Sequence, residues 1–294
     1  MKLYAPKYYR NFKCIADKCE HSCCIGWEID IDADTLKKYQ GLNGGYGEVI
    51  KSSISLDGDP HFKLGAHDRC PHLNERGLCN IILNLGEDHI CGICREHPRF
   101  YNFTSVAEVG IGMSCPEAAR VILASPEYYV FDEIGEMAAN TDDVCFDGSA
   151  ERGRVFDILR DTGASYRSRL EVIREKYGIT QEDDGFWLSK IDSLEYLNGD
   201  HKKLFMKYSK DNRPEGNDEY LERALAYFIY RHCTEAIDSA DFCALLKFSM
   251  FCEGLLASLI CTENAASLSE AAALASIISE EIEYSDDNTF ILTC

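Results

Sequence analysis

The chain has 294 residues, of which 46% are hydrophobic, and a formal net charge of −20. This length and apolar content suit one large domain or two smaller ones with a buried core. The negative charge repels phosphate backbones, so we expect no nucleic-acid partner. No stretch approaches the roughly 18 uninterrupted apolar residues of a membrane span, and residues 1–7 contain no apolar signal core, so we expect a cytoplasmic protein without a membrane partner.

The cysteines are the most informative residues. Nine of the fifteen fall in the first 115 residues, in short clusters: Cys14, Cys19, Cys23, Cys24, Cys70, Cys79, Cys91, Cys94 and Cys115. Thiolates gathered in one place are stable only when a metal or cluster neutralises them or when they oxidise to disulfides. A reducing compartment and an odd total both favour metal ligands over a fully paired disulfide framework.

The segments between the first clusters have short-range patterns. Apolar and acidic residues alternate over 27–32, which predicts a half-buried strand with an acidic face. Asp34 is placed to cap a helix that ends at Gly41. Residues 41–69 are rich in Gly, Ser and Asp with weak periodicity, which predicts an irregular loop.

The next segment carries most of the remaining thiols. Cys70 and Cys79 flank a turn at 74–77 that brings both thiols to one side. A short helix is predicted after Cys79, and residues 100–113 have a strand-like composition. Pro116 follows Cys115 directly, so a helix is predicted to begin there with the Cys115 thiol at its positive end.

The second half of the chain has helical periodicity. An acidic stretch over 126–152, broken by Gly and Asn, marks the expected boundary. We therefore predict a mainly α (α+β) fold with two domains: a cysteine-rich metal or iron–sulfur module with short strands over 1–125, and a helical domain over 126–294. Ser267 and Glu270 form a capping-box pattern before the last long helix.

The cysteine pattern indicates a metal or iron–sulfur site but leaves its identity open. Only Cys91-x2-Cys94 has the regular spacing of structural zinc, and the irregular spacing of the others favours a cubane 4Fe–4S cluster, with zinc as the alternative. One cluster needs four thiols, and the sequence does not select them. Four histidines lie near the cysteines and are expected to be exposed rather than ligands: His21, His72, His89 and His97.

Several common enzyme motifs are absent from the sequence. It has no GxxxxGK, no GxGxxG after a strand and no GxSxG, which excludes the common nucleotide, dinucleotide and hydrolase sites. The CxxxCxxC triad of radical S-adenosylmethionine enzymes is also missing, because residue 26 is glycine.

The cysteine clusters and their neighbours resemble the flagellin lysine-N-methylase family, which is related to a broader group of iron- or zinc-chelating cysteine-cluster proteins. The likeness is specific over roughly residues 6–124. The segments that carry it are Cys14-x4-Cys19-x3-Cys23-Cys24-x-Gly26-Trp27, Cys70-Pro71-x-Leu73, Gly77-Leu78-Cys79-x-Ile81, Leu85-Gly86-Glu87, Cys94-Arg95-x-x-Pro98-Arg99 and Ser114-Cys115-Pro116-Glu117-Ala118-Ala119-Arg120.

The resemblance implies an iron–sulfur protein that transfers methyl groups from S-adenosylmethionine to lysine ε-amino groups of flagellin. The metal ligands it implies are Cys14, Cys19, Cys23, Cys24, Cys70, Cys79, Cys94 and Cys115, and Cys91 lies outside this set. Arg95 and Arg99 are expected either to bind the cofactor's methionine carboxylate or to compensate the cluster thiolates.

No catalytic residue is assigned from the sequence. Methylating lysine requires a neutral, aligned amine, and carboxylates or tyrosines near the cluster segment can accept its proton. Candidates by proximity alone are Tyr8, Tyr9, Glu28, Asp30 and Asp32. The alternative functions are a non-enzymatic iron- or zinc-binding or redox protein built on the same cysteines, and a zinc-stabilised interaction domain.

Overall fold

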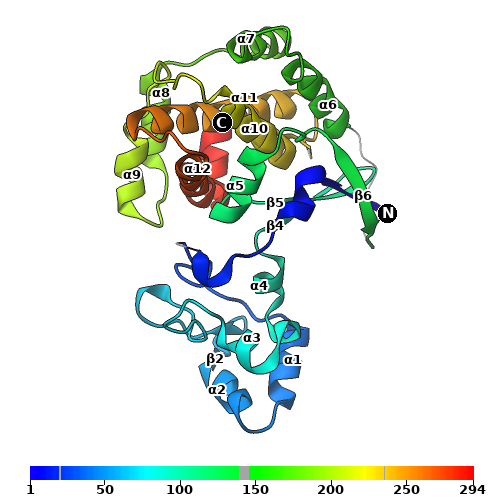
Figure 1. The fold of residues 1–294 in the computed structure, drawn as a ribbon, viewed down its shortest axis with the longest axis vertical. Helices are drawn as coiled ribbons and strands as arrows, with labels where there is room; N and C mark the ends of the chain where they lie inside the picture. The colour runs from blue at the N-terminus through cyan, green and yellow to red at the C-terminus, as the bar shows by residue number, and fades with distance from the viewer. Residues whose placement is uncertain (20, 139–145, 235) are drawn as a thin grey trace. The chain divides into compact units, whose positions relative to one another are not determined.

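The computed structural model describes residues 1–19, 21–138, 146–234 and 236–294 (Figure 1). The chain divides into two compact units. The first, which we call the helical unit, consists of Met1–Phe12 and Arg99–Cys294, and the second, the cysteine unit, is Lys13–Pro98. Each unit has its own hydrophobic core. The predicted fold class, mainly α with a small sheet and a helical C-terminal half, is confirmed.

This division differs from the predicted domains 1–125 and 126–294. Strands β1, β4 and β5 and helix α5 precede residue 125 yet belong to the helical unit. The physical reason is pairing across the chain, since β1 bonds to β6, beyond the expected boundary, and α5 packs on α10 and α12. The acidic stretch 126–152 lies partly outside the described residues.

The helical unit combines one sheet with most of the helices. Its strands are β1 (Lys2–Pro6), β4 (Arg99–Phe103), β5 (Ala107–Ile111) and β6 (Phe131–Glu136). Its helices are α5 (Pro116–Ala124), α6 (Gly148–Leu159), α7 (Tyr166–Tyr177), α8 (Asp184–Ser193), α9 (Gly199–Phe205), α10 (Asp218–Phe228), α11 (Ser239–Thr262), α12 (Leu268–Glu283) and α13 (Asp286–Thr293), with a 3-10 helix at Lys7–Asn11 and a π-helix at Ile229–Cys233.

The four strands have the order β4-β5-β1-β6. β5 is antiparallel to β4 and parallel to β1, and β1 is antiparallel to β6. Every residue of β5 is buried, because this strand has a neighbour on each side and helices pack nearby. The strand-like composition of residues 100–113 therefore corresponds to the β4–β5 hairpin.

An ion pair joins the sheet to the helices. Arg152 of α6 donates two hydrogen bonds to the carboxylate of Glu108 in β5, at 2.6 and 2.8 Å, and a third to the Thr234 hydroxyl at 2.7 Å. Both charged side chains are nearly fully buried. Such bidentate geometry fixes direction as well as distance, so this pair sets where α6 packs.

Helix α11 forms the centre of the helical core. Most of its residues from Phe242 to Ile260 are buried, all around the helix axis. Among the described residues it is the helix whose length and apolar composition alone would allow it to cross a membrane, and its burial is that of a core helix. Its cysteines do not converge: Cys252 is buried, Cys243 partly buried and Cys261 exposed.

The cysteine unit is built from short elements. They are α1 (Ala33–Gly41), α2 (Tyr46–Ser53), α3 (Asn80–Leu85), α4 (Gly92–Glu96) and the two-stranded sheet of β2 (Ile54–Ser55) and β3 (His61–Phe62), with 3-10 turns at Ala16–Lys18, Ala66–Asp68 and Glu87–His89. Its core has few large side chains, among them the fully buried Tyr39 and Ile50.

Three local predictions in this unit need correction. Residues 27–32 alternate in burial as predicted but pair only through a single bridge, Asp30 with His61, so they form no strand. The cap of α1 is Asp32 rather than Asp34. Residues 41–69 contain α2 and the β2–β3 pair rather than a loop alone. Ile50, Ile54 and Phe62 of these elements are buried in the core, but the elements are too short to show a periodic pattern in the sequence.

Two predicted helix starts are confirmed. Cys115 is the N-cap of α5, with Pro116 as its first residue. Ser267 and Glu270 form the reciprocal capping box of α12. Both starts depend only on contacts within one turn, which is why the sequence was sufficient.

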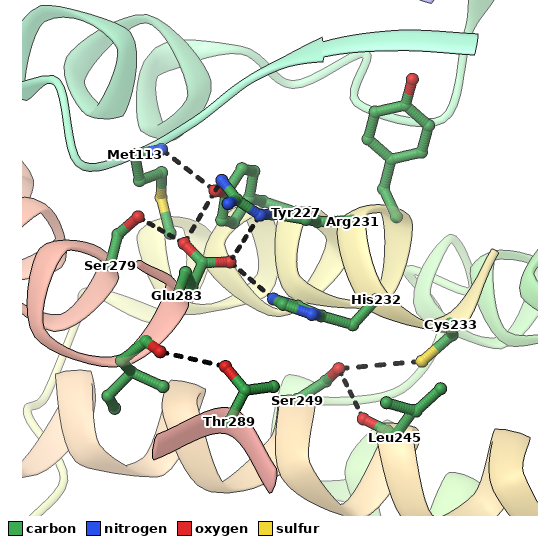
Figure 2. Close-up of polar contacts among 12 residues, drawn as sticks. Met113, Tyr227, Arg231, His232, Cys233, Leu245, Ser249, Ser279, Glu283 and Thr289 are labelled. Carbon is green, nitrogen blue, oxygen red and sulfur yellow. Dashed lines mark hydrogen bonds and ion pairs between the residues drawn. The ribbon is translucent and has the colours of Figure 1, made fainter. Parts of the chain in front are cut away.

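A buried carboxylate links the π-helix to α12 (Figure 2). The side chain of Glu283 is fully buried, and His232 Nε2 donates to it at 2.6 Å. The Tyr227 hydroxyl donates to it at 2.8 Å, the Ser279 hydroxyl donates to it as well, and Arg231 Nε lies 3.3 Å away. The carboxylate therefore has partners on both of its oxygens.

The same network holds the segment that precedes α5. The Tyr227 hydroxyl accepts a hydrogen bond from Met113 N at 3.1 Å (Figure 2). The Ser114 hydroxyl donates to the Tyr284 hydroxyl at 3.0 Å, and Ser276 donates to the Ser114 carbonyl at 2.8 Å. Residues 113–114 are thus fixed at three points by α10, α12 and the residue after α12.

Replacing Glu283 by glutamine tests the buried pair. Glu283→Gln keeps the side-chain size but leaves Arg231 buried without its anion, so we expect the free energy of unfolding to fall by about 3–5 kcal/mol in urea titrations. Glu133→Gln is the control, because it breaks an exposed pair with Lys2 and should leave the midpoint nearly unchanged. Equal effects of the two substitutions would contradict the role given to burial.

The same carboxylate predicts a pH dependence. Burial acts to raise the pKa of Glu283, but the Arg231 charge and the His232 hydrogen bond outweigh it and hold the pKa below the ordinary 4.5. A carboxyl whose pKa is lowered by folding contributes stability above its unfolded pKa and loses it as pH falls through its folded pKa. The stability difference between wild type and Glu283→Gln should therefore shrink below about pH 4.5. A difference that grows toward acid would refute this assignment.

Candidate functional site

Five thiols of the cysteine unit lie within electrostatic range of one another. They are Cys24, Cys70, Cys79, Cys91 and Cys94, and each affects the pKa of at least one other member of the group. We call them the thiol group. Cys70 and Cys91 are buried, Cys24 and Cys79 are partly buried, and Cys94 is exposed. Residues separated by as many as 70 positions thus share one region of this unit.

Backbone pairing brings the first three thiols together. Cys70 N donates to the Cys24 carbonyl at 2.8 Å, beside the bridge between Ile25 and Arg69. A second bridge, between Leu73 and Cys79, closes the turn at 74–77 that the sequence predicts. The turn therefore places the Cys70 and Cys79 thiols near each other, as expected.

Helix starts place the other two thiols. Cys91 is the N-cap residue of α4, and Cys94 lies inside that helix. The Tyr39 hydroxyl of α1 donates to the His89 carbonyl at 2.6 Å and lies 3.6 Å from Cys91 Sγ. Tyr39 is fully buried, so it fixes the position of the 89–91 segment.

Two thiols of the group ionise more readily than ordinary cysteine. A hydrogen bond from Cys23, assisted by Ser22 and the Arg69 charge against the opposing effect of burial, lowers the pKa of Cys24 to about 7. A hydrogen bond from Cys94 lowers the pKa of Cys91, with Tyr39 contributing.

The other three thiols hold their protons. Burial raises the pKa of Cys70 to about 12, and the neighbouring Cys24 and Cys79 add to the increase. Burial likewise raises the pKa of Cys79. The pKa of Cys94 is raised chiefly by its hydrogen bond to Cys91, with a further contribution from the charge of neighbouring thiols. The group therefore cannot be fully ionised unless a cation neutralises it.

The thiol group is neither oxidised nor arranged around a metal. None of the fourteen described cysteines forms a disulfide. Across residues 1–19, 21–138, 146–234 and 236–294, no three or more His, Cys, Asp or Glu side chains form a group spaced to hold a metal ion. The donor chemistry suits a soft metal or iron–sulfur cluster, although the side chains do not have the spacing of a ligand set.

Of the remaining predicted ligands, Cys23 borders the thiol group through its hydrogen bond to Cys24, and the other three are not members of the group. Cys14 Sγ accepts a hydrogen bond from Ala16 N, and Cys19 Sγ donates to the His21 carbonyl at 2.7 Å. Cys23 is exposed and bonds to Cys24. Cys115 caps α5 in the helical unit. The predicted set of eight thus includes four members of the thiol group: Cys24, Cys70, Cys79 and Cys94.

Cys91 is the residue that the resemblance did not include. Its side chain is fully buried, and it contacts both Tyr39 and Cys94. The signal was present in the sequence, since Cys91-x2-Cys94 is the one regular CxxC spacing.

The two predicted cofactor-binding arginines belong to different units. Arg95 Nη2 donates to the Ile90 carbonyl at 3.0 Å in the cysteine unit. Arg99 Nε donates to the Tyr9 hydroxyl at 2.8 Å in the helical unit, and its guanidinium also lies 5.8 Å from the Tyr9 ring centroid. Each guanidinium therefore has a partner within its own unit.

The acidic and histidine candidates near the cysteines have structural partners. Burial acts to raise the pKa of Asp32, but N–H bonds from Gly92 and Thr35 outweigh it and hold the pKa at about 2, which makes Asp32 a weak proton acceptor. Glu28 lies 3.2 Å from His61 Nδ1. His72 is buried and bonds to the Tyr46 and Ser53 hydroxyls.

The other acid–base candidates differ in burial and therefore in their ability to accept a proton. Tyr8 is buried, and burial raises the pKa of its hydroxyl, so it is a poor proton acceptor near neutral pH. Asp30 is exposed. Burial lowers the pKa of His72 to about 4, which keeps that histidine neutral.

Comparisons with known proteins identify three related chains from Salmonella. The flagellar biosynthetic protein FliU of Salmonella muenchen is 28% identical over 136 residues, which is 44% of this chain and 80% of FliU. The lysine-N-methylases of Salmonella choleraesuis (strain SC-B67) and Salmonella typhimurium (strain LT2) are each 28% identical over 138 residues, which is 44% of this chain and 34% of each methylase.

The match thus spans about a third of the length of the lysine-N-methylases. No family model matches the chain, and no solved structure matches it. The chain is thus similar, over part of its length, to two lysine-N-methylases and to FliU, in agreement with the likeness in cysteine pattern.

Proposed function

We propose that this protein is a cytoplasmic, S-adenosylmethionine-dependent protein-lysine N-methyltransferase that acts on flagellin and carries a 4Fe–4S cluster. The observation that carries the proposal is the similarity to two lysine-N-methylases over 44% of the chain. The thiol group supports the cluster, because five thiols share a region in which they cannot all ionise without a cation.

The thiol group contains the residues that would hold the cluster. Four ligands would come from Cys24, Cys70, Cys79, Cys91 and Cys94. Bound there, a cluster would neutralise the thiolates and supply a redox-active centre. Cys24 and Cys91, whose pKa values are lowered, would supply the first thiolates.

The charge of the chain suits a basic substrate. A net charge of −20 attracts lysine-rich segments from solution. Methyl transfer needs the lysine amine neutral and in line with the sulfonium methyl carbon, and positioning supplies much of the acceleration.

A second candidate is a non-enzymatic iron- or zinc-binding protein built on the same thiols. It is favoured by one observation: the similarity covers only 34% of each methylase.

Metal content separates iron from zinc. We expect protein purified without oxygen to be brown, with about four irons and four sulfides per chain, the composition of one cubane. Cys91→Ser should lower the iron content at least by half, because Cys91 is fully buried inside the thiol group, whereas Cys261→Ser, which changes an exposed cysteine of α11, should not. A colourless protein with about one zinc held by four thiolates would favour the second candidate.

Methyl transfer tests the activity itself. Anaerobic protein, flagellin and S-adenosylmethionine with a labelled methyl group should yield methylated lysines that mass spectrometry detects in flagellin. Cys91→Ser should reduce the yield strongly and Cys261→Ser should not. Iron-loaded wild-type protein that methylates neither flagellin nor other lysine-rich proteins would overturn the proposal.

A further inference from the structure

The helical unit has a groove whose lining includes Tyr8 but none of the predicted metal- or cofactor-binding residues. It is formed by the 3-10 helix Lys7–Asn11, the second half of α5, the segment that follows α5 and the start of β6. Its volume is about 560 Å³, within the range of roughly 300–1,000 Å³ typical of small-molecule sites. Its lining includes the apolar side chains of Val121 and Ala124 and several charged side chains.

Two of the cations in the groove are already neutralised. Lys7 Nζ lies 2.7 Å from Glu127, and Arg120 makes two hydrogen bonds to Glu117. Arg10 is different, because it makes no ion pair or hydrogen bond with any residue the structure describes. In a chain with a net charge of −20, an exposed arginine without an acidic partner leaves a guanidinium available for an external anion.

The opposite charge lines the same groove. Asp132, near the start of β6, contributes its carboxylate to the lining. It raises the pKa of Lys7 through charge, after the larger effect of Glu127, but it accepts no side-chain hydrogen bond within the described parts of the chain. The groove therefore offers one guanidinium and one carboxylate to a ligand.

We propose that this groove binds the zwitterionic amino-acid end of S-adenosylmethionine. Arg10 would hold the α-carboxylate in a charge-assisted, bidentate manner, and Asp132 would accept from the α-ammonium. This inference rests on the proposed function for the identity of the ligand. It assigns the carboxylate of the cofactor to Arg10 rather than to Arg95 or Arg99, whose guanidinium groups donate to Ile90 and Tyr9.

Calorimetric titration of the intact, anaerobically purified protein with S-adenosylmethionine tests the site. We expect Arg10→Ala and Asp132→Asn each to raise the Kd about tenfold, the effect of losing one charge-assisted contact. The control is Arg167→Ala, an exposed arginine of α7 outside the groove, which should leave the Kd unchanged. Circular dichroism melts of all three variants should match wild type, because both groove residues lie at the surface of the fold.

Two further ligands distinguish an error in the position of the cofactor site from an error in the proposed methyltransferase function. 5′-Methylthioadenosine lacks the amino-acid end, so its binding should be the same in wild type and Arg10→Ala, while L-methionine binding should weaken in Arg10→Ala. Wild-type binding of S-adenosylmethionine that neither groove substitution weakens would overturn the groove and leave the proposed function standing. Wild type that binds L-methionine through Arg10 but not S-adenosylmethionine would overturn the methyltransferase and keep the groove as an amino-acid site.

Discussion

The cysteine unit depends on one electrostatic constraint: five thiols share a small region whose burial and mutual repulsion prevent full ionisation. The pKa values of Cys24 and Cys91 are lowered, which favours the thiolate, whereas those of Cys70 and Cys79 are raised, which favours the thiol. Protonated thiols pack in a small core as ordinary small hydrophobic groups, whereas several thiolates gathered together need a cation. The proposed cluster would supply that positive charge.

The helical unit is organised by buried ion pairs rather than by thiols. Arg152 and Glu108 connect α6 to the sheet, and Glu283 connects α12 to the π-helix through Arg231. A π-helix is uncommon and often occurs at functional sites. Here it turns Arg231 and His232 toward one carboxylate (Figure 2), and the same network anchors the segment before α5.

The proposed chemistry uses features of both units, each for its own physical reason. Thiols of the cysteine unit suit a soft metal centre. The groove of the helical unit is lined by the Arg10 guanidinium, the Asp132 carboxylate and apolar side chains. These groups complement a zwitterion that is attached to a larger organic group. The acidic surface then favours a cationic protein substrate over an anionic one.

The sequence was sufficient to predict the features that depend on neighbouring residues. The helix start at Cys115-Pro116, the capping box at Ser267, the turn between Cys70 and Cys79 and the mainly helical class were all predictable, because each is set within a few residues. The folded structure was needed to show that Cys91 joins the thiol group and that Asp32 caps α1 and bonds to Gly92. It was also needed to show that β1 pairs with β6 across more than 120 residues. These outcomes depend on burial and on pairing between distant segments, which local spacing does not encode.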